Sequence, residues 1–428
     1  MTRQYRAPRG TQDILPDKQP SWDFVRDAVA QLCTVFGYRR IETPVFEDAS
    51  LFTRGVGEVT DIVQKEMYVF QDRGGQDLAL RPEGTAPVCR AYLEHGLHNL
   101  PQPVRLWYWT PIFRYDRPQA GRYRQHHQFG AEAIGEADAA VDAEIIELLW
   151  RVYEELGLTD LSLNLNSIGD QNCRPAYLEL LRDYYRDRLS LVCADCKARY
   201  ERNPLRLLDC KQERCQPIVA GAPTMTEHLC PECSAHFDDL RSYLASADVP
   251  FLLNPRLVRG LDYYTRTTFE VLPKEEGGQS TIGGGGRYDG LIEALGGPST
   301  PGVGFSIGLD RVLLLVEEKG FAPEPPAGGI YIVAMEGTRL VAPMLARALR
   351  QVYTVDYDLE GRGVNAQMKA ADKSGARAVM LLGEEEWQRG EVVLKDLRTG
   401  TQQTVPLEGI VEALDRLLLG ETQGTEIP

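Results

Sequence analysis

The sequence predicts an α+β protein in which a large domain carries an inserted segment and a smaller α/β domain follows at the C-terminus. Apolar strand patterns at residues 105–135, 250–272 and 303–308 alternate with amphipathic helix patterns, as in a sheet flanked by helices. Residues 173–248 are rich in charge and cysteine and interrupt the strand patterns. Residues 321–329 are rich in Pro and Gly, which predicts a linker before the last domain.

At 428 residues the chain is long enough for two or three domains. We place the first at 1–325, with its insertion at about 173–248, and the second at 330–428. No stretch approaches the ~18 consecutive apolar residues of a spanning helix, and the N-terminus lacks the apolar core of a signal peptide. We therefore expect a cytoplasmic protein with no membrane partner.

The first hundred residues predict helices that alternate with short strands. Apolar residues recur at helical spacing over 22–36, which predicts the first helix. The segment YRRIETPVFE reads as a strand interrupted at Pro44, which cannot donate to a ladder and so predicts an edge or interface strand. Residues 67–81 predict a hairpin with a Gly-Gly turn, and residues 86–97 predict a helix.

Residues 105–135 predict two paired strands joined by a loop with turn residues. Residues 105–124 of this hairpin contain a single acid, Asp116, and five arginines: Arg105, Arg114, Arg117, Arg122 and Arg124. A guanidinium is a planar fork of donors that matches phosphate oxygens, so the hairpin predicts a phosphate site. The alternative is an ordinary solvated hairpin.

Strand spacing from Arg124 onward places Arg124, Gln128 and Glu132 on one face. A cation, an amide and a carboxylate on one face suit a charged, amphoteric substrate. The rest of the chain is acidic, with a net charge of -15 and a pI near 5.0. Concentrated positive charge in an acidic chain excludes a protein that coats nucleic acid through bulk charge.

After the hairpin, residues 138–156 predict a strong helix and residues 161–169 an alternating strand. The glycine run at 283–286 would by itself favour a flexible loop, but Arg287-Tyr288 directly after it favours the wall of a site.

Residues 303–308 alternate apolar and small side chains, which predicts a strand whose backbone a ligand can approach. The helix that follows carries Arg311 in its first turn, where anions are favoured. Residues 330–428 alternate strands and helices, and they predict a small α/β domain with a mixed sheet.

Six of the nine cysteines fall in the insertion, as C-x2-C, C-x4-C and C-x2-C pairs. Two C-x-x-C pairs are a zinc signature. We predict one structural Zn²⁺, with Cys210 or Cys215 as a substitute for one ligand; the four ligands expected are Cys193, Cys196, Cys230 and Cys233. The alternative is a set of reduced cysteines in a helical insertion. The three remaining cysteines are expected to be isolated buried thiols: Cys33, Cys89 and Cys173.

Five stretches in a fixed order resemble the histidyl-tRNA synthetases, a family of class II aminoacyl-tRNA synthetases. The segment around Pro44 resembles the dimer-interface motif, FRYDRPQAGRYRQHHQFGAE the second motif with its loop, and PGVGFSIGLDR the third motif. LVRGLDYYTRTTFE (257–270) and GGGGRYDGL (283–291) resemble stretches peculiar to the histidine enzymes. The resemblance covers nearly the whole chain.

This resemblance implies a class II antiparallel sheet of six or seven strands flanked by helices, a C-terminal anticodon-binding domain and a homodimer. It also implies a histidine–tRNA ligase reaction in two steps. L-Histidine attacks the α-phosphate of ATP to give histidyl-adenylate and pyrophosphate, which Mg²⁺ accompanies. The terminal ribose of tRNA(His) then takes the histidyl group.

The resemblance also assigns roles to residues. The catalytic pair is Arg114 and Arg259, and Arg259 takes the place of a metal ion at the reacting phosphate. The positions that match the histidine-binding site are Glu83, Thr85, Arg114, Gln128, Glu132, Arg259, Tyr263 and Tyr264. Those that match the ATP site are Arg114, Arg122, Arg124 and Arg311. The loop that reads the tRNA acceptor end contains Arg117 and Gln119.

Several of these residues have an ordinary structural alternative. Tyr263 and Tyr264 would also fit a core aromatic pair. Glu83 would fit a helix N-terminal acid that the helix dipole favours. His126 and His127 lack ligand spacing to another histidine, so we interpret them as strand histidines.

The C-terminal domain holds eleven Lys and Arg against fifteen Asp and Glu, so it is not basic. If it binds an anticodon, it requires a local patch and base stacking. The candidates, each equally compatible with a solvated turn and helix start, are Arg362, Asn365, Gln367 and Lys369.

Two other functions compete with the ligase. A synthetase-like regulatory subunit of ATP phosphoribosyltransferase would resemble the catalytic domain, but it lacks the anticodon domain and loses key site residues. Here residues 330–428 are present and so are Arg114, Gln128, Glu132 and Arg259. An RNA-binding module built on an inactive synthetase core is the second alternative, and the intact site argues against it.

Overall fold

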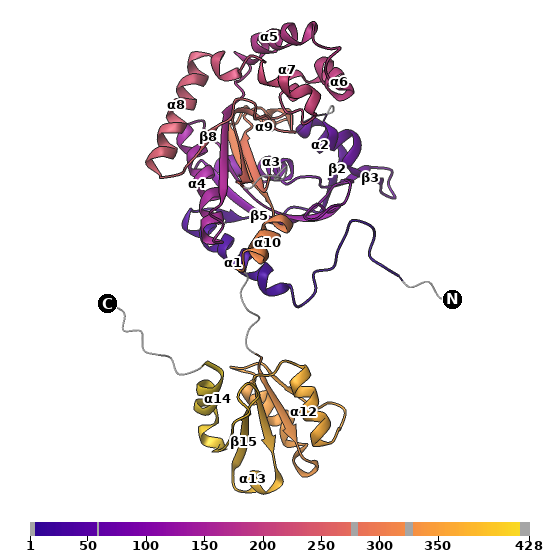
Figure 1. Ribbon diagram of the computed structural model, residues 1–428, viewed down its shortest axis with the longest axis vertical. Coiled ribbons are helices and arrows are strands. Elements are labelled where there is room, and N and C mark those ends of the chain that lie inside the picture. The colour runs from indigo at the N-terminus through magenta and orange to yellow at the C-terminus, as the bar shows by residue number, and fades with distance from the viewer. Residues whose placement is uncertain (1–4, 58–59, 275–280, 322–327, 420–428) are drawn as a thin grey trace. The chain divides into compact units, whose positions relative to one another are not determined.

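The computed structural model describes residues 5–57, 60–274, 281–321 and 328–419 (Figure 1). The chain forms two compact units, Met1–Pro323 and Glu324–Pro428. The predicted linker at 321–329 lies mostly outside the described residues and stays a prediction. Within the described ranges, none of the helices has the length and apolar character that a membrane span requires.

The first unit is organised around one sheet. Its strands are β1 (Arg39–Arg40), β5 (Val104–Phe113), β6 (Gln125–Ile134), β7 (Leu161–Ser167), β8 (Leu252–Leu253), β9 (Thr265–Pro273), β10 (Gly283–Arg287) and β11 (Gly302–Gly308). They lie in the order β1-β5-β6-β11-β10-β9-β7-β8. The strands from β5 to β7 in this order are antiparallel, whereas the short edge strands β1 and β8 pair in parallel. This confirms the predicted α+β fold, and the glycine run is a strand rather than a loop.

Helices cover this sheet. They are α1 (Gln19–Val35), α2 (Ala49–Val56), α3 (Thr85–Glu94), α4 (Ala139–Glu155), α9 (Leu291–Ala294) and α10 (Leu309–Glu318). Side chains alternate between the two faces of the sheet, as strand geometry requires. Trp107, Phe129 and Phe305 lie in the main core with α1, α4 and α10. The alternate positions Tyr108 and Gln128 line a cavity on the other face.

The helical insertion is present as predicted, and its helices α5 to α7 cluster together (Figure 1). Its helices are α5 (Arg174–Arg186), α6 (Ala194–Arg202), α7 (Gln216–Ala220) and α8 (Pro231–Ser246). The first three enclose their own core around Tyr177 and Tyr185. Helix α8 instead packs on α4 and buries Phe237 and Leu240 in the main core, which fixes one end of the insertion to the sheet.

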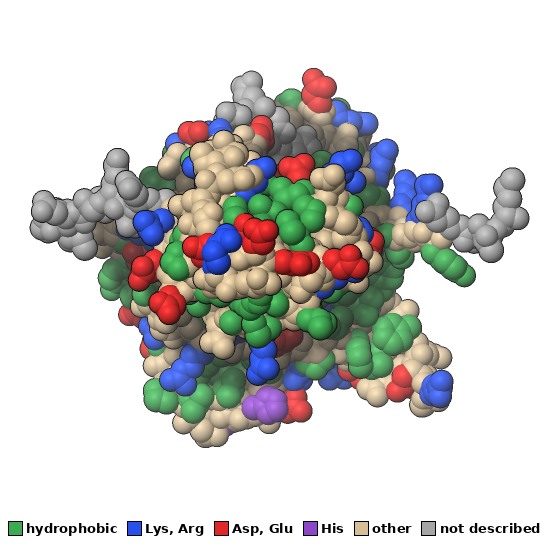
Figure 2. Space-filling view, turned by 90° about the horizontal axis from the view of Figure 1, so that it is seen from below, with side chains coloured by type: hydrophobic (Ala, Val, Ile, Leu, Met, Phe, Trp, Pro, Cys, Tyr) green, Lys and Arg blue, Asp and Glu red, His purple; other side chains and the backbone are tan. Residues whose placement is uncertain are grey.

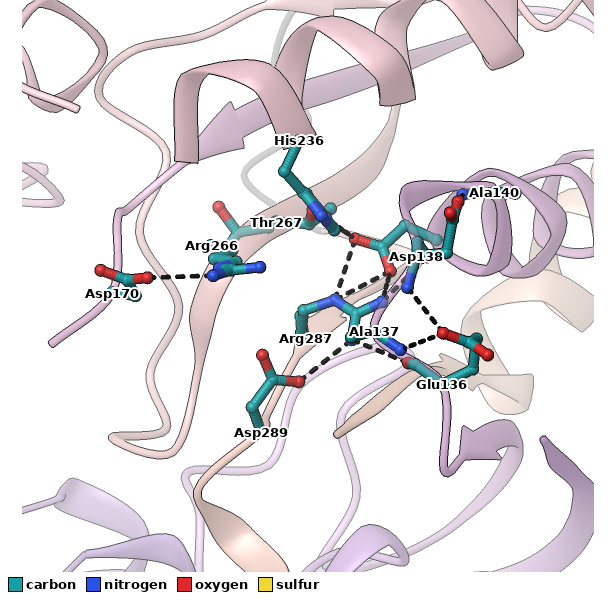
Figure 3. A network of polar contacts seen from close by, with 12 residues as sticks. Glu136, Ala137, Asp138, Ala140, Asp170, His236, Arg266, Thr267, Arg287 and Asp289 are labelled. Atoms are coloured by element: carbon teal, nitrogen blue, oxygen red, sulfur yellow. Dashed lines mark hydrogen bonds and ion pairs between the residues drawn. The ribbon is translucent and has the colours of Figure 1, made fainter. Parts of the chain in front are cut away.

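A buried polar network lies where α4, α8, β9 and β10 meet (Figure 3). Asp142, which is fully buried, accepts hydrogen bonds from Arg287, from Thr267 Oγ1 at 2.5 Å and from His236 Nε2 at 2.8 Å. Burial by itself would raise the pKa of Asp142, but the Arg287 guanidinium and the bond from His236 hold it below its usual range. The network holds the glycine strand β10 against the insertion, since Arg287 ends that strand.

Replacing Asp142 by asparagine is expected to lower the free energy of unfolding by roughly 3–5 kcal/mol. The fully buried Arg287 guanidinium would lose its buried counter-charge and keep only the partly exposed Asp289. Urea unfolding followed by circular dichroism measures this. Asp239→Asn makes the same chemical change at an exposed position of α8 and should cost less than about 0.5 kcal/mol. Equal losses in the two variants would contradict the role of the network.

A small sheet of β2 (Phe46–Asp48), β4 (Asp77–Leu80) and β3 (Tyr68–Gln71) lies beside the main one. It confirms the predicted hairpin and the break in the strand at Pro44. This small sheet leaves Phe46 and Phe70 half-exposed, with their ring centroids 6.4 Å apart. Val45 and Val69 beside them are exposed as well.

The second unit is the predicted mixed α/β domain. Its elements are β12 (Ile330–Ala334), α11 (Val341–Leu349), β13 (Val355–Tyr357), α12 (Val364–Lys373), β14 (Ala378–Leu382), α13 (Glu384–Gln388), β15 (Glu391–Asp396), β16 (Gln402–Pro406) and α14 (Ile410–Leu419). The strand order is β13-β12-β14-β15-β16. Strand β16 and helix α13 were not predicted, because both are short and polar and neither carries a clear hydrophobic period.

One candidate RNA contact in this unit is excluded by its position. Gln367 is buried, and its amide bonds both the N–H and the carbonyl of Ala334 at 3.0 Å. It therefore joins α12 to β12 instead of facing a ligand. On the face drawn in Figure 2, acidic and basic side chains are mixed.

Candidate active site

A cavity of about 340 Å³ opens on the polar face of the main sheet. Its walls come from β5, β6, β10 and β11, from the arginine loop between β5 and β6, and from residues 259–264. It brings together most of the residues proposed from the sequence, which are Glu83, Thr85, Arg114, Arg122, Gln128, Arg259, Tyr263, Tyr264 and Arg311.

Glu132 lies beneath the cavity floor and is fully buried. Three hydroxyl groups of the lining donate to its carboxylate: Thr85 at 2.7 Å, Tyr288 at 2.6 Å and Tyr108 at 3.3 Å. Burial raises the pKa of Glu132 to about 8, against a usual value of 4.5, although these hydroxyl donors favour the ionised form. Near neutral pH this carboxyl can therefore hold a proton or accept one from a bound ligand.

Glycines make room for these polar side chains. Glu132 lies across the ladder from Gly304, and Tyr108 lies across from Gly130. A Cβ on Gly304 would lie 1.8 Å from Glu132 Oε2, and a Cβ on Gly130 would lie 2.2 Å from the Tyr108 ring. Gly304, one of the small residues predicted to let a ligand approach the backbone, thus makes room for the Glu132 side chain, and Gly130 makes room for Tyr108.

Two hydrogen-bond acceptors in the cavity differ in whether they already have a donor. The buried Gln128 Oε1 has no hydrogen-bond partner among the described residues, so it is an acceptor available to a ligand. Glu83 accepts from the backbone N–H groups of Thr85 and Ala86, each at 2.8 Å. Glu83 therefore caps helix α3, as in the structural alternative, while it also lines the cavity.

Two arginines of the cavity carry unneutralised charge. Arg114 donates to the Pro82 carbonyl at 2.7 Å, and Arg311 donates to the Thr281 carbonyl at 2.7 Å. No carboxylate of the described residues lies within ion-pair distance of either one. Burial lowers the pKa of both guanidinium groups, which shows that their charge is poorly compensated. An anionic ligand would supply the missing counter-charge.

Arg259 is placed by a carboxylate. It forms an ion pair with Glu270 on β9, and Glu270 also accepts from Thr281 Oγ1 at 3.2 Å. Its guanidinium carbon lies 5.9 Å from the centroid of the Tyr264 ring. The buried Arg259 Nε has no partner among the described residues. Arg259 is therefore held over the glycine strand with one donor still available.

The sequence model of histidyl-tRNA synthetases matches residues 10–170 and 205–312, and that of the anticodon binding domain matches residues 330–417. The chain belongs to the histidyl-tRNA synthetase family. A histidine–tRNA ligase of Dehalococcoides mccartyi is 54% identical over 410 residues, which cover 95% of this chain and 98% of that protein. A second, from Desulforamulus reducens, is 51% identical over 94% of this chain and 97% of its own length.

Solved structures of the family have the same fold. The apo histidyl-tRNA synthetase of S. aureus superposes with a TM-score of 0.81 at 36% identity, over 96% of this chain and all of that one. An ATP phosphoribosyltransferase regulatory subunit/histidyl-tRNA synthetase from Bacillus halodurans reaches 0.63 at 22% identity, over 89% of this chain and all of that one, and shows the fold alone. The ligase relatives confirm the predicted enzyme, an aminoacyl-tRNA synthetase, over the regulatory-subunit alternative.

The loop residues assigned from the family lie at the edge of the site. Arg122 lines the cavity and forms an ion pair with Asp116. Arg124 lies outside the lining, with its guanidinium 3.8 Å from the centroid of the Tyr115 ring. Arg117 and Gln119 are exposed and lie outside the cavity. The ATP role of Arg124 and the tRNA roles of Arg117 and Gln119 stay predictions.

The site also contains three residues for which the sequence indicated no individual role, although Tyr288 was expected at its wall. Tyr108 and Tyr288 bond Glu132, and Glu270 holds Arg259. Glu270 and Tyr288 lie in the two stretches that resemble the histidine enzymes, 257–270 and 283–291. Tyr108 lies on β5, which pairs with the β6 strand that carries Gln128 and Glu132. His126 lines the cavity too, and burial beside Arg114 lowers its pKa to about 3, so it is a neutral imidazole.

The predicted grouping of the zinc ligands is wrong. The structure does not bring the two C-x-x-C pairs together. One lies with the C-x4-C pair, in a group of Cys193, Cys196, Cys210 and Cys215. The other lies with two residues from before α5, in a group of Asp170, Cys173, Cys230 and Cys233. Cys173 is therefore not isolated, because the start of α5 folds back onto the start of α8.

Proposed function

We propose that this protein activates L-histidine with ATP and transfers the histidyl group to tRNA(His). One observation carries this proposal. A buried carboxyl, Glu132, lies beneath the floor of a cavity that is also lined by arginines without a counter-ion. An imidazole needs an acceptor for one ring N–H and a partner for the other nitrogen. Glu132 and Tyr264 supply these groups. The α-ammonium meets the free Gln128 Oε1, with Glu83 and Thr85 beside it.

Adenylation joins the substrate carboxylate to the α-phosphate and releases pyrophosphate. Arg259 and Arg114 stabilise the charge that develops on the phosphoryl oxygens, because both guanidinium groups are fixed before the reaction. Arg311 binds the nucleotide at the start of α10, and Arg122 contributes from the loop. Tyr263 and Tyr264 close the wall on the histidine side; their centroids are 4.7 Å apart.

Mg²⁺ neutralises charge on the β- and γ-phosphates when ATP is bound. The lining carboxylates are already engaged, since Glu83 caps α3 and Asp116 pairs with Arg122. Magnesium usually keeps several waters and binds through substrate phosphates. We therefore expect Mg²⁺ to enter with ATP rather than to reside in the protein.

The second unit supports tRNA as a partner, and the small sheet supports a second copy of this chain. The anticodon binding domain supports contact with the anticodon stem of tRNA(His), while Arg117 and Gln119 meet the acceptor end. The exposed apolar group of Val45, Phe46, Val69 and Phe70 supports a homodimer, because it adjoins the segment that resembles the family's interface motif.

ATP–pyrophosphate exchange with each amino acid in turn tests the proposal. Exchange that depends on histidine alone is the expected result, and charging of tRNA(His) should follow. Absence of exchange with histidine in folded protein would overturn it. A pocket built to hydrogen-bond both ring nitrogens should reject analogues without them by a factor of about 10⁴.

Replacing Gly304 by alanine is expected to raise KM for histidine at least about tenfold, because the new Cβ displaces Glu132. Steady-state exchange kinetics measure this. Gly290→Ala is the control, since a Cβ there meets nothing within 4 Å. Unchanged KM for histidine in Gly304→Ala would contradict the placement of Glu132.

A further inference from the structure

We propose that the insertion binds two structural zinc ions, each at one of the two groups described above. We name Cys193, Cys196, Cys210 and Cys215 the first zinc site. We name Asp170, Cys173, Cys230 and Cys233 the second zinc site. In each group, one ligand atom per residue lies within 4.8 Å of all the others. Neither site has a role in the reaction proposed above.

The first zinc site has the geometry of a thiolate tetrahedron. Cys193 Sγ and Cys210 Sγ are 3.8 Å apart, which matches the edge of about 3.8 Å that four Zn–S bonds of ~2.3 Å produce. The same separation is far longer than a disulfide bond of about 2.05 Å. Two backbone N–H groups also point at sulfur, from Cys193 to Cys215 Sγ at 3.2 Å and from Cys196 to Cys193 Sγ at 3.4 Å.

The second zinc site combines three thiols with one carboxylate. Asp170 Oδ1 lies 3.7 Å from Cys173 Sγ and 3.9 Å from Cys230 Sγ, close to an S–O edge of roughly 3.5 Å in a zinc tetrahedron. Gly169 permits this approach, because its φ is +63° and a Cβ there would lie 2.7 Å from Cys173 Sγ. Carboxylate oxygen is an ordinary zinc ligand, so the set is chemically complete.

The two sites share a plan. A C-x2-C pair lies at the start of a helix in each, since Cys193 precedes α6 and Cys230 precedes α8. A helix N-terminus favours negative charge and therefore thiolate. Segments distant in the chain supply the other ligands. Buried thiols that pack only as small apolar groups have no need to converge from separate segments in groups of three or four.

The second zinc site also adjoins the histidine wall of the cavity. Asp170 Oδ2 accepts from Arg266 at 3.1 Å, and Arg266 has a φ of +50°. The backbone N–H of Arg266 donates to the Gly169 carbonyl at 2.8 Å. Arg174 donates to the Tyr264 carbonyl at 2.9 Å. Metal at this site would therefore fix the segment that carries Tyr264. This consequence rests on the proposed histidine activation, whereas the metal sites themselves do not.

Metal analysis of the full chain, purified without chelator, tests the proposal. We expect about two zinc ions per chain, and Co²⁺ in their place should give the visible and near-ultraviolet absorption of tetrahedral thiolate sites. The variant with Cys193→Ser and Cys210→Ser should lose one ion, and so should the one with Cys173→Ser and Cys230→Ser. Cys33→Ala, a buried cysteine in α1 outside both groups, should keep both.

Kinetics separate the sites. Loss of the second zinc should raise KM for histidine about fivefold or more with KM for ATP within twofold, whereas loss of the first should move neither more than twofold. Fewer than half a zinc per chain after Zn²⁺ is added back, with no thiolate–cobalt absorption, would overturn the proposal. That result needs no variant to fold and is independent of catalysis.

Discussion

Replacing Arg259 by alanine is expected to lower kcat for histidine-dependent ATP–pyrophosphate exchange by about 10²–10³-fold, the usual loss when one preorganised donor at a developing charge is removed. Arg259 is mostly buried, lines the cavity and is held in place by Glu270, and its buried Nε has no partner among the described residues. Its charge is therefore placed before ATP arrives. KM for ATP should change much less, because Arg114 and Arg311 remain.

Two further variants sharpen this test. Glu270→Gln keeps the Arg259 guanidinium but removes its counter-charge, so we expect a loss of about tenfold. Arg347→Ala makes the same change as Arg259→Ala at an exposed position of α11 and should leave exchange unaltered. A kcat in Arg259→Ala within threefold of the parent, with the fold intact, would contradict the role assigned to this arginine.

Replacing Glu132 by glutamine is expected to raise KM for histidine by about tenfold. Glutamine places an NH2 donor where the imidazole N–H and the three hydroxyl groups need an acceptor. The same variant should be more stable than the parent at alkaline pH. The carboxyl is fully buried, and burial raises its pKa to about 8 from 4.5. The parent therefore bears an ionisation penalty on folding that glutamine does not have.

The sign of this pH effect follows from proton linkage. Below pH 4.5 the carboxyl is protonated in both the folded and the unfolded chain, so it adds no pH dependence. Between pH 4.5 and about 8 the unfolded chain releases the proton while the folded chain keeps it. Stability from this group is thus present at low pH and is lost as the pH rises to about 8, by on the order of 3–5 kcal/mol in total.

Urea unfolding of the parent and of Glu132→Gln at pH 5, 6.5 and 8 measures the difference. The stability gap in favour of the variant should widen with pH. Glu155→Gln, at the exposed end of α4, should show a gap that does not vary with pH. A constant gap for Glu132→Gln would mean that Glu132 is already ionised in the folded chain.

Local pattern and motif order were enough to predict much of this protein. The structure has a helix where residues 22–36 show a helical period and a strand where residues 303–308 alternate. Each pattern places apolar side chains on one face, which the fold must bury. The arginine hairpin and Arg311 were placed at one site by their resemblance to motifs. Most of the residues assigned in this way do line one cavity.

Other features depend on contacts between distant segments. Asp142 reads as an ordinary polar residue of a helix, and Arg287 was expected at the wall of the site. The two instead form a buried pair across 145 positions of the chain. Glu270 holds Arg259, and Tyr288 bonds Glu132, only because strands β9 and β10 return beside β6 and β11. No local period reports such a pairing.

The sequence by itself determined the α+β class, the order of most elements, the enzyme family and many of the polar groups that line the cavity. The tertiary structure alone decided which groups meet. It gave Glu132 its raised pKa through burial, gave Gly304 its role through the space that a carboxylate occupies, and divided the cysteines into two groups. Spacing along a chain fixes neighbours within a helix or strand, whereas burial, desolvation and metal-ligand distances arise between segments that only the packed fold brings together.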